Sequence, residues 1–184
     1  ALDTEVDFFT VVDDLAEDEE TGAAHANDME LGAGLFYGYV VVDIPLLVSN
    51  LTGCPRTEWH REDLEETRQL LALLVNAISQ VSPGAKLGAT APYARAEFVM
   101  LEVGKTQPRS LANAFLTPVR LESTSDPMQA SISAIADYLS ALEQMYANDG
   151  EKRYISTIRS WPRQQEQIMT LPEAIERSLE SISG

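Results

Sequence analysis

The sequence predicts an α+β fold in which helices pack on one side of an antiparallel sheet. Runs rich in aromatic and β-branched residues at 8–15 and 35–44 are typical of strands. Apolar residues recur every three or four positions in 62–81 and again in 127–146, which is typical of amphipathic helices. The two patterns predict strands and helices that share one core within a single domain, 1–184.

The first two predicted strands flank a segment, 15–34, that is rich in Glu, Asp, Gly and Ala. Such a segment cannot bury a core, so it is predicted to be a long loop or hairpin projecting from the sheet. The second strand is almost continuously apolar over 36–44, as in a central strand covered on both faces. Pro45 and the polar stretch 49–55 are predicted to end it.

The remaining elements follow from local signals. Helix 62–81 has acidic residues in its first turns and is broken by Ser82-Pro83-Gly84. A strand is predicted at 96–103 and a strand-like segment at 111–119. Asp126-Pro127 starts a helix that runs to about 146. Thr170 and Glu173 start a last helix, which ends near 182.

The composition indicates a cytoplasmic protein without a cofactor. The chain holds a single cysteine, Cys54, which excludes a disulfide framework and a cysteine-rich metal site. The longest apolar run, 35–48, is interrupted by Asp43 and Pro45, so no membrane span or membrane partner is predicted. The N-terminus lacks the features of a signal peptide.

The net charge of -16 argues against nucleic-acid binding, because Lys and Arg supply most of the affinity for phosphates. The acidic residues up to Asp43 have no basic counterpart, since the first basic residue is Arg56. The rest of the chain is closer to balance.

The acidic run invites a second interpretation, a metal-dependent hydrolase or nuclease. Asp13, Asp14 and the acidic residues at 17–20 offer hard ligands for Mg²⁺ or Ca²⁺, with His25 and Asp28 nearby. Against this, the spacing does not match a calcium loop, and a run of like charges is usually a solvated surface. No nucleophile elbow, phosphate loop or histidine pair at metal spacing is present.

Six short motifs resemble, in order and spacing, the CasC family, the repeated backbone subunit of the type I-E CRISPR Cascade complex. The resemblance implies an RNA-recognition-motif-like (ferredoxin-like) palm, of which this chain is the C-terminal part, with 15–34 forming a thumb hairpin. The aromatic motifs of classical RNA-recognition motifs are absent. The six motifs are 7–10 (DFFT), 12–15 (VDDL), 22–25 (GAAH), 30–37 (ELGAGLFY), 83–86 (PGAK) and 108–115 (PRSLANAF).

The resemblance also implies an RNA-binding site. Phe8 and Phe9 point to opposite faces of a strand, so one ring, expected to be Phe8, can stack on nucleotides while the other packs inward. The alternative is that both rings belong to the core. Lys86 is placed beside the guide backbone, although Leu87 stands where the family usually has Gln. The residues that the resemblance assigns to RNA binding are Phe8, Phe9, Thr10, Gly22, Ala23, Ala24, His25 and Lys86.

The predicted function is therefore a non-catalytic subunit that binds crRNA, joins copies of itself and other Cascade subunits, and supports pairing with target DNA in antiviral defence. The metal-dependent hydrolase using Asp13, Asp14 and His25 remains the alternative. A third possibility is a protein-interaction module whose acidic loop docks on a basic partner.

Overall fold

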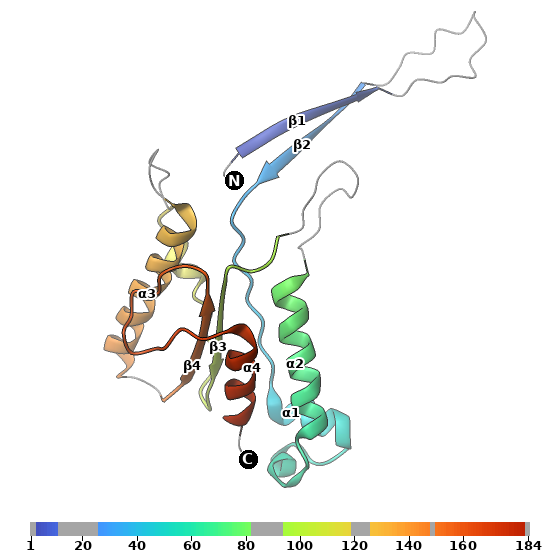
Figure 1. The fold of residues 1–184 in the computed structure, drawn as a ribbon. Coiled ribbons are helices and arrows are strands. Elements are labelled where there is room, and N and C mark those ends of the chain that lie inside the picture. The colour runs from blue at the N-terminus through green and yellow to red at the C-terminus, as the bar shows by residue number, and fades with distance from the viewer. Residues whose placement is uncertain (1–2, 11–25, 82–93, 119–125, 148–149, 183–184) are drawn as a thin grey trace, which may run out of the picture. The chain divides into compact units, whose positions relative to one another are not determined.

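The structure is a computed structural model that describes residues 3–10, 26–81, 94–118, 126–147 and 150–182. The chain divides into two compact units, Ala1–Gly38 and Tyr39–Gly184, and each is described by itself (Figure 1). Within the described ranges, no helix combines the length and the apolar character that crossing a membrane requires.

The first unit contains an antiparallel pair of strands, β1 (Asp3–Thr10) and β2 (Ala26–Ala33). Their register runs from Asp3 opposite Ala33 to Thr10 opposite Ala26. The observed strand thus begins earlier than the predicted run at 8–15. Of the predicted thumb 15–34, the structure describes only the part from position 26, which forms β2.

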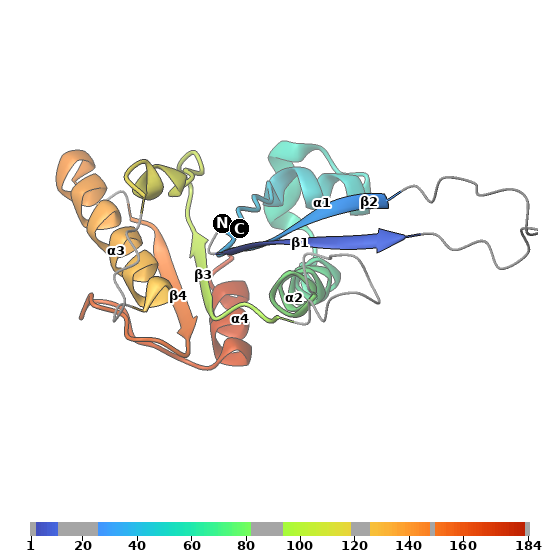
Figure 2. The ribbon, with the colours of Figure 1, turned by 90° about the horizontal axis from the view of Figure 1, so that it is seen from above.

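The second unit carries the helices and a second pair of strands, β3 and β4 (Figures 1 and 2). In chain order its elements are α1 (Ile44–Thr52), the 3₁₀ helix η1 (Arg56–Arg61), α2 (Glu65–Gln80), β3 (Phe98–Val103), the 3₁₀ helix η2 (Ala112–Phe115), α3 (Pro127–Tyr146), β4 (Lys152–Thr157) and α4 (Leu171–Glu180).

The β3–β4 sheet is covered on both faces, which corrects the prediction of helices on one side. The antiparallel register runs from Phe98 opposite Thr157 to Val103 opposite Lys152. Phe98 and Met100 pack towards the core under α3, whereas Val103 packs with Leu179 of α4. Because side chains alternate along a strand, β3 offers an apolar surface to a helix on each face. Figure 2 shows α3 and α4 on opposite sides of the sheet.

Two predicted strands are wrong. Residues 34–43 are irregular, and Ile44 instead begins α1. The Asp43 carboxylate accepts a hydrogen bond from the Leu46 N–H at 3.0 Å, and Pro45 occupies the first turn. Asp43, which was predicted to lie within the strand, therefore caps a helix. Within the segment 111–119, which was predicted to be strand-like, residues Ala112–Phe115 form the 3₁₀ helix η2.

The helices with clear caps were predicted correctly. Asp126 accepts hydrogen bonds from the N–H groups of Met128 and Gln129 at the start of α3. Thr170 and Glu173 form a reciprocal capping box at α4. Glu65–Gln80 confirms the predicted 62–81 helix, and Phe98–Val103 confirms the strand at 96–103. The sequence did not predict β4.

The second unit has two apolar clusters, one on each side of the sheet. The larger cluster fills the space between α3 and the sheet and consists of Leu111, Ile132, Ile135, Ala136, Leu139, Ile155 and Trp161. The smaller one joins α1 and α2 to the C-terminal end of the chain and consists of Val48, Leu64, Leu71 and Ile182.

Candidate functional site

Three of the residues assigned to RNA binding lie in the β1–β2 pair. Phe8 lies opposite Asp28, Phe9 opposite Asn27, and Thr10 opposite Ala26. The backbone therefore places these three positions at the end of β1 from which the chain continues toward 11–25. The other assigned residues, Gly22, Ala23, Ala24, His25 and Lys86, lie outside the described residues.

The described basic residues of the second unit are mostly neutralised within the chain. The arginines in ion pairs are Arg56, Arg61, Arg109, Arg153, Arg159 and Arg163. Arg68 instead donates to the backbone carbonyls of Leu179 and Ile182. Within the described ranges, Arg95, Lys105, Lys152 and Arg177 have no ion pair, and all four are exposed.

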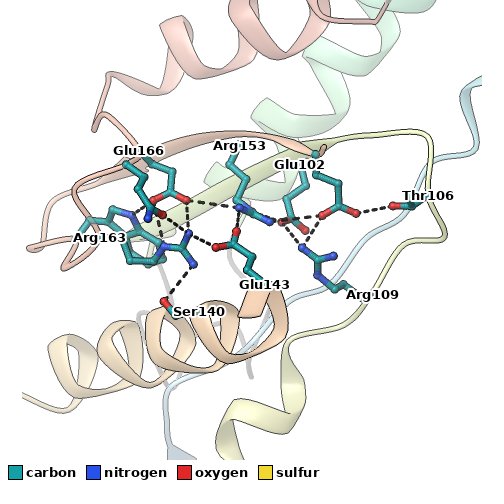
Figure 3. A network of polar contacts seen from close by, with 11 residues as sticks. Glu102, Thr106, Arg109, Ser140, Glu143, Arg153, Arg163 and Glu166 are labelled. Atoms are coloured by element: carbon teal, nitrogen blue, oxygen red, sulfur yellow. Dashed lines mark hydrogen bonds and ion pairs between the residues drawn. The ribbon is translucent and has the colours of Figure 1, made fainter. Parts of the chain in front are cut away.

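Charged side chains from several parts of the second unit converge on one ionic cluster (Figure 3). It joins β3, the residues after β3, α3, β4 and the segment after β4. Its members, called the ionic cluster below, are Glu102, Arg109, Glu143, Glu151, Arg153, Arg163 and Glu166.

The fold positions the centre of the ionic cluster through strand register. Glu102 lies opposite Arg153 in the β3–β4 pair, so both side chains project to the same face of the sheet, the face that α3 covers. Glu143, in the last part of α3, contacts Arg153 on that face of the sheet. Arg163 reaches the same carboxylate from the segment that follows β4.

The contacts in the ionic cluster are short. Arg153 Nε lies 2.5 Å from Glu102 Oε1, and Arg153 Nη1 contacts Glu143 Oε1. Arg163 Nη2 lies 2.7 Å from Glu143 Oε2 and 2.9 Å from Glu166 Oε1. At the other end, Arg109 Nη2 lies 2.6 Å from Glu151 Oε2. Charge-assisted hydrogen bonds, such as those that Arg153 donates to Glu102 and Arg163 donates to Glu143, are stronger than neutral ones.

Burial of the ionic cluster removes charged groups from water and shifts their pKa values. The side chain of Arg153 is only 5% exposed and that of Glu151 6%. Burial raises the pKa of Glu102, and Glu151 adds to the rise, although the hydrogen bond and charge of Arg153 oppose it. For Arg153, burial lowers the pKa, but the contacts with Glu102 and Glu143 outweigh burial and leave it raised. The ionic cluster contains four carboxylates and three guanidinium groups, so one carboxylate has no matching positive charge. This excess of negative charge agrees with the raised pKa of Glu102.

The ionic cluster holds elements together rather than offering a reactive group. Its arginines are directed at their own carboxylates, which leaves them poorly placed to bind a phosphate. In the residues that the structure describes, no three side chains of His, Cys, Asp or Glu gather into a metal site. Asp13, Asp14 and His25 of the alternative metal site lie outside the described residues, and Asp28 lies in β2.

Sequence reasoning did not find the ionic cluster. The one local signal was the alternation in Lys152–Thr157, which places Arg153 and Ile155 on the same face and is typical of a strand. The segment is short and begins with charged residues, so it does not stand out as a strand. The partners of Arg153 lie far away in the sequence, and only the strand register and α3 bring them together.

Comparison with known proteins gives a family and a fold. A family model described as CT1975-like protein matches residues 1–182. A chain of a structure titled CRISPR RNA-guided surveillance complex is similar with a TM-score of 0.75 and 27% identity over 97% of this chain. A chain titled CRISPR RNA-guided surveillance complex, pre-nicking, is similar with a TM-score of 0.72 and 26% identity over 97% of this chain.

The matched chains are longer than this one, which spans 65% of the first and 46% of the second. None of the curated protein sequences matches the chain. The similarity to the surveillance-complex chains agrees with the observed α+β architecture.

Proposed function

The chain belongs to the CT1975-like family of Cas proteins, and from this premise we propose that it is a non-catalytic, crRNA-binding backbone subunit of a type I-E CRISPR surveillance complex of the CasC kind. In this role, copies of the protein lie along a guide RNA beside other subunits. The guide is held by its backbone while its bases pair with target DNA.

One observation carries the proposal: nearly the whole chain resembles chains of CRISPR RNA-guided surveillance complexes in three dimensions. The family model covers the same extent, 1–182, so the similarity does not rest on one motif. The motifs that resemble CasC lie within this range and add the backbone subunit and the type I-E system to the proposal.

The proposed fold is an RNA-recognition-motif-like palm with a thumb. The described β1–β2 pair supports a hairpin thumb, because its two strands are antiparallel and are joined by the acidic stretch 11–25. The antiparallel β3–β4 pair with α3 packed against one face supports a palm that these elements help to build, and α4 covers the other face in addition.

Within that fold, we assign the RNA contacts as the resemblance implies. Phe8 stacks against splayed nucleotides, a sequence-tolerant contact, while Phe9 packs inward and Thr10 belongs to the same contact segment. The small residues 22–24 and His25 allow the thumb backbone to approach the guide or a neighbouring copy closely. Lys86 binds a guide phosphate as a point charge.

The acidic composition must be reconciled with RNA binding. The net charge of -16 is concentrated before Arg56. In the described part of the second unit, most arginines are neutralised by carboxylates of the chain itself. RNA affinity therefore depends on few basic residues and on stacking, so it should be low for isolated chains and rise when many copies bind one guide.

The test is co-expression of the protein with a CRISPR array and the neighbouring subunits, followed by purification and extraction of bound nucleic acid. We expect RNA of one defined length in a stoichiometric, salt-sensitive complex. Recovery of an RNA-free monomer would overturn the proposal.

A variant pair sharpens this test. Lys86→Ala should lower RNA retention, whereas Lys105→Ala should not, because both remove one lysine charge but only Lys86 is assigned to the guide. Phe8→Ala should weaken binding by roughly 1–3 kcal/mol for each stacked base. Equal loss with the two lysine variants would show that overall charge, not the assigned contact, governs retention.

A further inference from the structure

A groove of about 780 Å³ runs along the outer edge of β4, and none of its lining residues is among those assigned to RNA binding. The Arg153 side chain faces α3, whereas Lys152 and Tyr154 project to the other face of the strand. Because Lys152, Arg153 and Tyr154 all line the groove although they project to different faces of β4, the groove lies along the edge of this strand. Its walls are the last part of α3, the segment 163–169 and Arg177 of α4.

The backbone of β4 offers open hydrogen-bonding groups to this groove. The Ile158 N–H donates to the Glu97 carbonyl, so the alternation of an antiparallel pair directs the backbone groups of Ile155 and Arg153 away from β3. The Ile155 carbonyl accepts from the Met169 N–H at 2.9 Å. Among the described residues, nothing pairs in this way with the N–H and C=O of Arg153.

The accessible charges in the groove are positive. Lys152 and Arg177 are exposed and have no ion pair in the described ranges, and the exposed amides of Gln144, Gln165 and Gln167 lie with them. The carboxylates that also line the groove belong to the ionic cluster and are held by its arginines; they are Glu143, Glu151 and Glu166, at 17%, 6% and 9% side-chain exposure.

We propose that this groove binds an extended acidic peptide segment of a protein partner, which adds as a further strand to β4 beside Arg153. Strand addition uses backbone groups for affinity and side-chain pockets for specificity, and the groove supplies both beside the exposed Lys152 and Arg177. The parallel bridge between Ile155 and Ile168 already occupies the neighbouring stretch of this edge. The added strand continues that pairing toward Lys152.

The geometry favours a peptide over a nucleic acid. A peptide can satisfy the N–H and C=O of Arg153 together, whereas a phosphate accepts hydrogen bonds only. The three carboxylates along the groove also oppose a continuous row of phosphates, while a peptide can place its few carboxylates opposite Lys152 and Arg177. This interaction does not depend on guide binding.

The test measures binding of a labelled peptide to the whole chain by fluorescence anisotropy. The probe is the ten-residue sequence of positions 11–20 (VVDDLAEDEE), which combines strand-forming valines with acidic residues. We expect salt-sensitive binding that falls about tenfold with Lys152→Glu or Arg177→Glu. Arg95→Glu makes the same charge change outside the groove and should leave binding nearly unchanged. A probe with Asn and Gln in place of the acidic residues should not bind.

Strand addition has its own readout, slower amide hydrogen exchange at Arg153 when the peptide is bound. Lys152→Gln and Arg177→Gln provide milder variants if a charge reversal lowers the melting temperature. No binding of the peptide, equal loss with Arg95→Glu, or unchanged exchange at Arg153 would overturn the proposal. So would a single-stranded RNA oligonucleotide that binds the groove with the same sensitivity to Lys152→Glu, because the site would then be one for nucleic acid.

Discussion

Arg153 contacts four carboxylates although its side chain is only 5% exposed: Glu102, Glu143, Glu151 and Glu166. Taking a charge out of water is costly, and the hydrogen-bonded partners offset that cost only while the set is complete. The residue thereby ties β4 to β3, to α3 and to the segment after β4. The stability of this part of the chain should depend on it more than on any exposed charge nearby.

Replacing Arg153 with Met should lower the free energy of unfolding by roughly 3–5 kcal/mol, because the buried carboxylates lose their counter-charge. Urea unfolding measures the change. Lys152→Met is the matched control, since Lys152 is the exposed neighbour in the same strand without an ion pair in the described ranges. Its effect should stay within about 0.5 kcal/mol. Similar losses for both variants would contradict the assigned role of Arg153.

Glu102 makes stability depend on pH. Its pKa in the folded chain is raised from 4.5, chiefly by burial, so the folded state binds a proton more tightly than the unfolded state. The stability that this carboxyl contributes is present below its ordinary pKa and is lost as pH rises through the raised value. Glu102→Gln cannot lose a proton and escapes this loss.

The measurement is the free energy of unfolding of Glu102→Gln and of the parent chain, by urea at a series of pH values from about 4 to 7. The variant should gain relative to the parent as pH rises. A difference that stays constant, or that turns against the variant, would show that the carboxyl does not titrate in the predicted direction.

At the scale of elements, the start of α3 depends on one side chain with two functions. Asp126 caps the helix through the N–H groups of Met128 and Gln129, and it also lies 2.7 Å from Arg159 Nη1. Arg159 in turn contacts Glu97 just before β3. The cap therefore also links the start of α3 to the ends of both strands.

Asp126→Ala should lower the free energy of unfolding by about 1–2 kcal/mol, the usual effect of losing an N-cap. Asp137→Ala, an exposed position within α3, should have little effect or stabilise the helix slightly, because Ala has the higher helix propensity. Thermal or urea unfolding gives both values. Equal destabilisation by the two variants would argue against the capping role.

At the scale of the whole molecule, charge is divided along the sequence. The acidic residues up to Asp43 have no basic counterpart, and the later arginines mostly pair with carboxylates of the chain. Long-range repulsion of RNA should therefore originate mainly in the first part of the chain.

If the chain binds guide RNA as proposed, neutralising the acidic residues at 17–20 as Gln and Asn should tighten RNA binding at low salt. The gain should shrink as salt rises, because screening removes the repulsion that the variant relieves. Filter binding across a salt series measures it. The same number of changes at Glu65, Glu66, Glu176 and Glu180 separates a local effect from one of net charge. Weaker binding after neutralising 17–20 would mean that these carboxylates contact a partner in the assembly.

The sequence by itself determined α2, α3, α4 and β3, because their signals are local: caps at Asp126 and Thr170, apolar spacing in 65–80, and a short apolar run in Phe98–Val103 that is followed by a turn. It also carried the family resemblance, since the motifs are contiguous. The same local patterns misled at 36–44, where an apolar run suggested a strand but Asp43 caps a helix.

Tertiary structure alone decided the pairing of β3 with β4, the placement of helices on both faces, and the ionic cluster around Arg153. Glu102 and Arg153 are 51 positions apart and meet only through strand register, which no local pattern contains. The groove along β4 arises in the same way, from the backbone groups that pairing with β3 leaves facing outward. Local sequence specifies elements, whereas contacts between distant segments depend on how those elements pack.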